Sequence, residues 1–228
     1  MDLKDFVVKK IDNDIGRSFL EKYHYTHSCN LLIISYGFYY DDNLKSVVGF
    51  SRPSGKNLAK SIWDKGTDYN TLELIRLFSF DDCPKNTESY CISQSIKALK
   101  EDMPDVKILV SYADSSAGHI GYIYQASNWK YIGTGSNERK IFIDGERQHR
   151  RSLYGKYGTS SIVELKEKFG DRLQVSEDRF PKNKYVYVVG KNKFETKQIY
   201  SELKTKILPY PKGQIKYYNE GQSEFNNV

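Results

Sequence analysis

The chain is poor in cysteine, and its cysteines follow no metal-binding spacing. Only three occur in 228 residues, Cys29, Cys83 and Cys91. An odd number of scattered cysteines does not build the disulfide framework on which small secreted domains depend. We therefore expect free thiols and a reducing compartment, the cytoplasm.

Long apolar runs are also missing. No run approaches the roughly 20 residues that a membrane-spanning helix needs. The first ten residues, MDLKDFVVKK, lack the apolar core of a secretory signal peptide. We therefore expect no membrane partner. A hydrophobic content of 39% and a length of 228 residues allow one sizeable core with a small extension, and nothing indicates an oligomeric state.

The formal net charge is only +6, so its distribution is more informative than its sum. Positive charge gathers between positions 139 and 156, where two acidic residues accompany six basic ones: Arg139, Lys140, Arg147, Arg150, Arg151 and Lys156. The segment 139–154 predicts a hairpin that turns at Asp144-Gly145. Strand alternation would place Arg147 and Arg151 on one face and Arg150 on the other. This surface suits phosphate contact, and a solvated charged hairpin is the alternative.

Apolar periodicity and turn signals predict alternating helices and strands. Helices are expected at 14–25, 55–66, 88–102, 119–126, 158–171 and 195–208, with Asp14 as an N-cap and Ser161 with Glu164 as a capping box. Strands are expected in a hairpin over 30–53 and at 71–80, 106–114, 129–135 and 182–190. This order predicts an α/β fold, with a mixed central sheet flanked by crossover helices.

The same pattern predicts how the chain divides. Residues 1–157 would form a core that includes the basic hairpin. Residues 158–228 would form a C-terminal strand–helix extension packed on that core, with a loose tail rich in proline, glycine and asparagine from Pro209 onward.

One segment, GHIGYIYQASNWKYIG at residues 118–133, carries a specific signal. It resembles the last crossover of the GNAT acyltransferases, in which a helix ends A-x-x-x-Y-x-x-x-G-F. Tyr124 lies four residues before Asn128 and five before Trp129, which stand where that family has Gly and Phe. The resemblance implies a GNAT-like sheet and a Tyr124 that protonates a departing thiolate. A core tyrosine is the alternative, and His119 is expected only to start the helix.

The turn DDCPKNTES precedes the helix expected at 88–102. In GNAT proteins this turn holds the pyrophosphate of coenzyme A at a helix N-terminus, which implies acetyl-CoA as the cofactor. The usual glycines are absent here. Side chains would have to replace them, and the candidates are Lys85, Asn86, Thr87 and Ser89. A simple capped turn explains the same residues equally well.

Several motifs taken together resemble the Mom family of phage DNA-modification proteins. They are KYHY, LIRLFSFDDCPKNTES, SYAD…GHIGYIYQASNWKYIG, HRRSLYGKYGT and PYPKG, and they span roughly residues 20–213. The resemblance implies an enzyme that converts adenine in DNA to an N6-carbamoylmethyl form and so shields phage DNA from restriction. It also implies DNA as a partner and the cytoplasm of a bacterial host as the place of action.

The resemblance also transfers candidate site residues. His24 and Tyr25 would end the first helix at the acceptor site, and Arg76 would bind substrate from the strand at 71–80. Three more stand at the end of the strand at 106–114: Ser111, Tyr112 and Asp114. Asp114 would accept or orient the amine proton, Ser111 would bind substrate or act as a nucleophile, and Tyr112 would bind DNA. Turn and cap roles are the alternative for the serine and aspartate.

The adenine amine is not accessible for chemistry within a stacked duplex, so base flipping or unpaired DNA is expected. Tyr25, Tyr112 or Trp129 could stack on the extruded base. His24, His27 and Cys29 lack the spacing of a metal site, and no metal is expected. Two other functions stay open: a GNAT enzyme that acylates a small amine, a protein or RNA, and a DNA-binding protein with an inactive acyltransferase fold.

Overall fold

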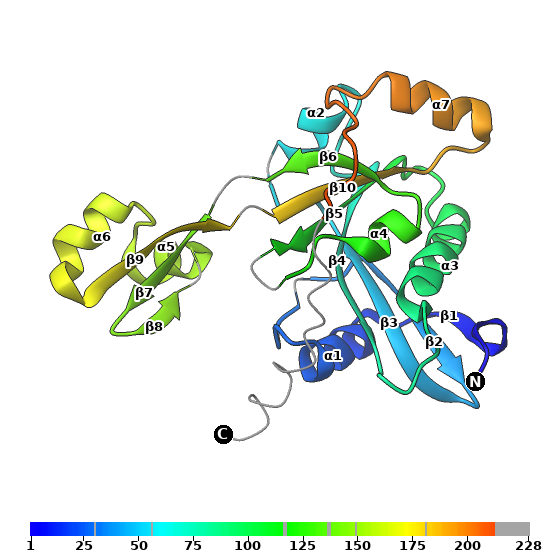
Figure 1. The fold of residues 1–228 in the computed structure, drawn as a ribbon, viewed down its shortest axis with the longest axis horizontal. Coiled ribbons are helices and arrows are strands. Elements are labelled where there is room, and N and C mark those ends of the chain that lie inside the picture. The colour runs from blue at the N-terminus through cyan, green and yellow to red at the C-terminus, as the bar shows by residue number, and fades with distance from the viewer. Residues whose placement is uncertain are drawn as a thin grey trace.

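The computed structural model describes residues 1–29, 31–55, 57–115, 118–135, 138–148, 150–180 and 182–212, with the backbone alone at 138–139, 150–151 and 177–180. Seven strands form a large sheet in the order β1-β2-β3-β4-β5-β10-β6, and three form a small sheet in the order β8-β7-β9. The two sheets lie in separate parts of the molecule (Figure 1).

The large sheet is mixed. Its strands are β1 (Val7–Ile11), β2 (Ile34–Tyr40), β3 (Asn43–Ser51), β4 (Thr71–Ser79), β5 (Ile108–Asp114), β6 (Lys130–Thr134) and β10 (Lys182–Val188). Only β4 and β5 pair in parallel, and all other neighbours pair antiparallel. The α/β fold with a mixed central sheet flanked by helices is therefore confirmed. The edge strand β1 was not expected, because its apolar pattern is short and interrupted by lysines.

Helices cover both faces of this sheet. They are α1 (Asn13–Tyr23), α2 (Leu58–Ile62), α3 (Thr87–Asp102), α4 (Tyr122–Ala126) and α7 (Lys193–Ser201). Alternation along β5 separates the two cores: Leu109 packs with residues of α3 and α4, whereas Ile108 and Val110 pack with residues of α2 and α7. The helix α1 lies over β3 and β4, where Leu20 packs against Val47.

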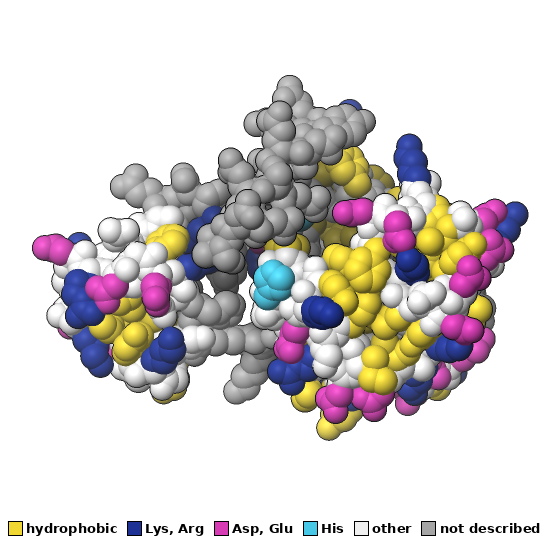
Figure 2. Space-filling view, turned by 90° about the horizontal axis from the view of Figure 1, so that it is seen from below, with side chains coloured by type: hydrophobic (Ala, Val, Ile, Leu, Met, Phe, Trp, Pro, Cys, Tyr) yellow, Lys and Arg dark blue, Asp and Glu magenta, His cyan; other side chains and the backbone are white. Residues whose placement is uncertain are grey.

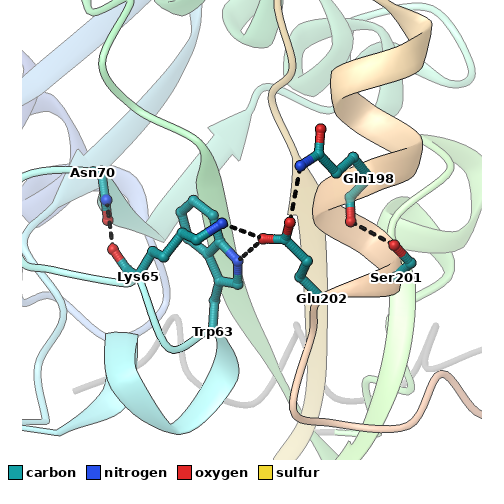
Figure 3. A network of polar contacts seen from close by, with 6 residues as sticks. All are labelled: Trp63, Lys65, Asn70, Gln198, Ser201 and Glu202. Atoms are coloured by element: carbon teal, nitrogen blue, oxygen red, sulfur yellow. Dashed lines mark hydrogen bonds and ion pairs between the residues drawn. The ribbon is translucent and has the colours of Figure 1, made fainter.

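A polar network ties α7 to the segment after α2 (Figure 3). Glu202 accepts hydrogen bonds from Trp63 Nε1 at 3.0 Å and from Lys65 Nζ at 2.9 Å. These contacts, first that with Lys65 and then those with Gln198 and Trp63, lower the pKa of Glu202 to about 2. An ionised carboxylate at the end of α7 therefore links this helix to the segment after α2.

The small sheet and two helices form the part of the chain called the small lobe below, residues 138–180. Its elements are β7 (Glu138–Ile143), β8 (Glu146–Gln148), α5 (Arg150–Tyr157), α6 (Ile162–Phe169), a 3-10 turn (Gly170–Arg172) and β9 (Leu173–Phe180). A division at residue 157 falls between α5 and α6 inside this lobe. The strand β10, expected in the extension, lies within the large sheet. The strand pairing therefore favours residues 138–180, and not 158–228, as the unit separate from the large sheet.

Several local expectations need correction. The hairpin turns at Asp144-Gly145 as predicted, with both residues at positive φ, but its return strand ends at Gln148 and a helix follows. The predicted alternation of Arg147, Arg150 and Arg151 is therefore wrong, because the last two are helical. Residues 150–157 form a helix because helical spacing buries Leu153 in the lobe's own core.

Capping also differs from expectation. The side chain that caps α1 is Asp12, which accepts from the Asp14 N–H at 2.8 Å, so Asp14 itself lies inside the helix. Ser161 stands at the N-cap of α6 without a side-chain capping bond, so the predicted capping box is not formed. The tail beyond residue 212 lies outside the described residues.

Candidate active site

The site begins where the parallel strands β4 and β5 part. They pair only from Thr71 to Glu73, although β4 continues to Ser79 and β5 to Asp114. Just beyond Glu73, the pairing of β4 with β3 shifts register: Phe50 lies opposite Leu74, but Gly49 lies opposite Arg76. A bulge of this kind bends a strand away from its neighbour. The two strands therefore part at their carboxyl ends, the usual ligand position in an open α/β sheet, and this region is called the opening below.

Ser111 bridges this opening. Its Oγ lies 2.8 Å from the Leu74 carbonyl oxygen and 2.7 Å from the Tyr124 hydroxyl. A carbonyl oxygen can only accept a hydrogen bond, and the serine hydroxyl has a single proton to donate. Ser111 therefore donates to the Leu74 carbonyl oxygen and accepts a hydrogen bond from the Tyr124 hydroxyl. Ser111 is buried, and this chain of bonds uses its proton structurally. The arrangement does not favour Ser111 as a nucleophile, since it provides no activating base.

Tyr124 is packed among aromatic rings. Its ring centroid lies 5.4 Å from that of Trp129 and 5.3 Å from that of Tyr185. Burial raises the pKa of Tyr124 to about 12, so the phenol stays protonated at neutral pH and can donate. The close approach of α4 to Tyr185 depends on Gly121. This glycine has φ +95°, and a Cβ there would lie 2.4 Å from the Tyr185 ring.

The other side of the opening carries His24, Tyr25 and His119. The Tyr25 ring stacks on His24 at 4.4 Å and lies 6.0 Å from His119. Tyr25 is 59% exposed. Burial first, and then the charge of Asp114, raise the pKa of Tyr25. The fold thus brings together His24, Tyr25, Arg76 and Asp114, which the sequence places in three separate segments, and adds His119.

His24 is neutral in this setting. It caps the end of α1, and the Thr26 backbone N–H donates to its Nδ1 at 3.2 Å. Burial, followed by the positive charge of Arg76 and the neighbouring histidines, lowers the pKa of His24 to about 4. Because Nδ1 accepts, we assign the ring proton to Nε2. At neutral pH, His24 is therefore an uncharged ring with a donor at Nε2, and its Nδ1 is occupied by Thr26.

Arg76 fixes the segment after α1 to β4. Its Nε donates to the Ser28 carbonyl at 3.0 Å, and its Nη1 donates to the Ile75 carbonyl at 2.7 Å. Among the described residues it forms no ion pair with a carboxylate. Its charge therefore acts on the opening, where it lowers the pKa of His24 and opposes the rise at Tyr25.

Tyr112 lies on the other face of β5 from Ser111. It packs with the residues of α2 and α7, and Lys184 Nζ lies 6.0 Å from its ring. Burial first, and then Glu73, raise the pKa of Tyr112 to about 12. The structure thus separates Tyr112 from Tyr124 across the sheet.

The turn before α3 meets the expectation only in part. Lys85 and Asn86 are exposed, and Asn86 adopts a left-handed conformation at the start of the helix. The Thr87 hydroxyl donates to the Pro84 carbonyl and the Ser89 hydroxyl to the Asn86 carbonyl. These two hydroxyls are engaged by the turn itself, so Lys85 and Asn86 are the side chains that remain for a phosphate.

The predicted basic residues belong to the small lobe. Arg147 is exposed on β8, while the side chains of Arg139, Arg150 and Arg151 lie outside the described residues. Within the described ranges, no group of three or more His, Cys, Asp or Glu side chains could hold a metal ion. No helix in that part of the chain has the length and apolar character to span a membrane.

His119 is the site residue that the sequence did not identify. It was expected to start a helix, but α4 begins at Tyr122, and His119 precedes it as an exposed loop residue facing Tyr25. Its only signal was its position between two glycines after the strand end. On the face drawn in Figure 2, basic and acidic side chains are interspersed on both parts of the molecule.

Comparison with known proteins decides the family. The model of the Mom protein family matches residues 5–212. The chain belongs to the Mom protein family. Methylcarbamoylase Mom of Escherichia phage Mu is 28% identical over 212 residues, covering 92% of this chain and 85% of the relative. The resemblance found in the sequence is therefore confirmed.

Solved acetyltransferases match the structure only with TM-scores below 0.5. A probable acetyltransferase from Staphylococcus epidermidis ATCC 12228 is 9% identical with a TM-score of 0.45, covering 81% of this chain and 99% of that one. A putative acetyltransferase from Salmonella typhimurium, solved with its cofactor acetyl-CoA, is 7% identical with a TM-score of 0.46. The match covers 83% of this chain and 96% of that one. At these scores the family assignment rests on the Mom match alone.

Proposed function

We propose that this member of the Mom family is an enzyme that modifies adenine in DNA to an N6-carbamoylmethyl form and so protects phage DNA from restriction. The observation that carries the proposal is the match to the Mom family over residues 5–212. The related protein of phage Mu is named a methylcarbamoylase, which agrees with transfer of a carbamoylmethyl group.

We propose acetyl-CoA as the cofactor. The residues fit it in two places. Beyond Glu73, β4 leaves β5 and can accept an extended chain along that edge. At the start of α3, the exposed Lys85 and Asn86 can bind a phosphate. When bound, the cofactor would supply a thioester that activates an acyl group.

Each residue of the candidate site has a separate role in this proposal. Tyr124 would hold its proton on the phenol and give it to the thiolate that departs, because its raised pKa keeps it a donor. Asp114 would accept or orient the proton of the attacking amine. Tyr25 would stack on the extruded adenine, and Arg76 and neutral His24 would hold its edge or its phosphate.

An acetyl group alone does not make the product. Attack of the amine on an acetyl thioester would release the thiolate and give an N6-acetyl amide, bonded through the carbonyl carbon. A carbamoylmethyl group is bonded through its CH2 carbon and contains an amide nitrogen that acetate lacks. The product therefore also requires a nitrogen donor with a two-electron oxidation of the methyl carbon, or an acyl group that already carries nitrogen on that carbon followed by a rearrangement. The proposal therefore includes a nitrogen-containing co-substrate.

Mass spectrometry of nucleosides from DNA of cells that express the protein tests the function. A new adenine derivative with the added carbamoylmethyl mass is expected. Modification found only on a small amine, a protein or RNA would instead identify an ordinary acyltransferase. DNA binding without any modified nucleoside would identify an inactive acyltransferase fold.

Calorimetry with coenzyme A tests the cofactor separately. Binding should raise the melting temperature by mass action. Lys85→Ala should reduce that rise, whereas Lys97→Ala, an equal loss of charge further along α3, should leave it unchanged. Absence of binding at millimolar coenzyme A would exclude it as the cofactor.

A further inference from the structure

The small lobe has a core of its own. Ile141, Ile143, Leu153 and Leu165 are buried together, with Tyr157 and Phe169 packed against them. All belong to residues 138–180, and the other core clusters contain no residue of that range. Its strands pair only with one another. The lobe therefore folds around side chains that the large sheet does not use.

The lobe leaves the large sheet beside the candidate site. The chain leaves at the end of β6 and returns at the start of β10, and these strands are antiparallel neighbours with Thr134 opposite Asn183. Next to them, Lys182 lies opposite Asp114 at the end of β5. The lobe is thus inserted between two neighbouring strands, and β6 ends and β10 begins at the level of Asp114 (Figure 1).

Charge is unequal on the two helices of the lobe. The helix α5, RRSLYGKY, contains three basic residues and no acidic one. The helix α6, IVELKEKF, contains two basic and two acidic residues. Among the described side chains near α5, Arg147 and Lys156 are exposed, and Tyr154 is 68% exposed. Basic residues gathered on one helix suit contact with phosphates, although the exposed Glu146 lies beside Arg147 on β8.

We infer that residues 138–180 are a DNA-docking lobe, which binds the phosphate backbone with its β8–α5 side while the base enters the opening beyond Asp114. The inference rests on the proposed function. Arg147 and Lys156 contact phosphates. Docking on the lobe supplies affinity for DNA, and the opening in the large sheet supplies the chemistry and the choice of adenine.

The test uses full-length protein in two double variants with the same change in net charge. Arg147→Ala with Lys156→Ala alters the β8–α5 side, and Lys166→Ala with Lys168→Ala alters α6 on the same lobe. DNA binding is measured by fluorescence anisotropy on several sequences across a salt series. Modification is measured as kcat and KM for duplex DNA, and melting temperatures establish that both variants are folded.

We expect the first variant to flatten the salt slope by about 2, one unit for each lost phosphate contact. It should raise KM for DNA roughly tenfold on every sequence at 0.1 M salt and leave kcat and the preference for adenine unchanged. The α6 variant should behave as wild type. Equal slopes in both variants would overturn the docking lobe while leaving the proposed function intact.

The experiments distinguish a failure of the proposed function from a failure of the docking proposal. If wild-type protein yields no modified adenine, the proposed function fails, and the anisotropy comparison still reports whether the β8–α5 side binds DNA. If the first variant is unfolded, Arg147→Lys with Lys156→Arg keeps the charge and should restore both folding and salt slope. A conservative pair that folds but binds with the flattened slope would contradict phosphate contact.

Discussion

The two sides of the β4–β5 opening differ in every property that matters for chemistry. On the side of α3 and α4, Ser111 and Tyr124 are buried and joined by a hydrogen bond of 2.7 Å, and Ser111 also donates to the Leu74 carbonyl at 2.8 Å. On the side of α1, Tyr25 is 59% exposed and lies among Arg76, Asp114 and two histidines. A buried, fixed donor suits an unchanging leaving group, whereas an exposed aromatic ring among charges suits a large substrate.

The largest effect is expected on the buried side. Tyr124→Phe keeps the ring that packs on Trp129 and Tyr185 and removes the hydroxyl group with its proton. The rate of adenine modification should fall roughly 10²-fold or more, with unchanged melting temperature and DNA affinity. Quantification of modified nucleoside checks this. Modification at the wild-type rate would make Tyr124 a packing residue.

A smaller loss is expected for Ser111→Ala, which takes away the acceptor of Tyr124 and the donor to Leu74. The phenol would lose its orientation, so the rate should fall roughly tenfold. Stability should fall by about 1–3 kcal/mol, because a buried carbonyl loses its hydrogen bond.

Ser95→Ala is the matched control for that substitution. Ser95 is also fully buried, and its hydroxyl makes no hydrogen bond among the described residues. Its removal should leave both activity and stability at or above wild type. Urea unfolding and the modification assay separate the two variants, and equal losses in both would mean that burial alone explains Ser111.

On the exposed side, the ring of Tyr25 is expected to matter more than its hydroxyl. Tyr25→Ala should raise KM for DNA roughly tenfold, since stacking on an aromatic ring contributes about 1–3 kcal/mol per base. Tyr25→Phe should retain most of the affinity. Steady-state kinetics on one duplex checks the pair. A Phe variant as poor as the Ala variant would assign the role to the hydroxyl.

The smallest effect concerns pH. The pKa of His24 is lowered to about 4 in the folded protein, chiefly by burial, from an unfolded value of 6.5. The unfolded state therefore binds a proton first as pH falls. The stability contributed by neutral His24 is complete above pH 6.5 and is lost between 6.5 and 4. Urea unfolding from pH 7.5 to 4 should show this decline, and His24→Gln should flatten it. If the stability of the variant declined with pH as the stability of wild type does, the proposal of a buried, neutral His24 would be contradicted.

Much of the fold was accessible from local patterns. The hairpin of β2 and β3, the strands β4 and β5 and the long helix α3 follow from apolar periodicity and turn residues. The strand β9 was missed although Leu173 and Val175 alternate with polar residues, because the helix expected at 158–171 and the strand expected at 182–190 left that stretch unassigned. The helix α5 was missed because a hairpin turn implies a return strand, and only packing of Leu153 ends that strand early.

The sequence by itself determined the family, the order of the main elements and most of the residues that gather at the opening, because these depend on motifs and on local periodicity. Only the tertiary structure decided the rest. The parting of β4 from β5, the bond between Ser111 and Leu74, and the contact of His119 with Tyr25 join residues far apart in the chain. Such contacts depend on how strands pair and bend, and no local pattern specifies that.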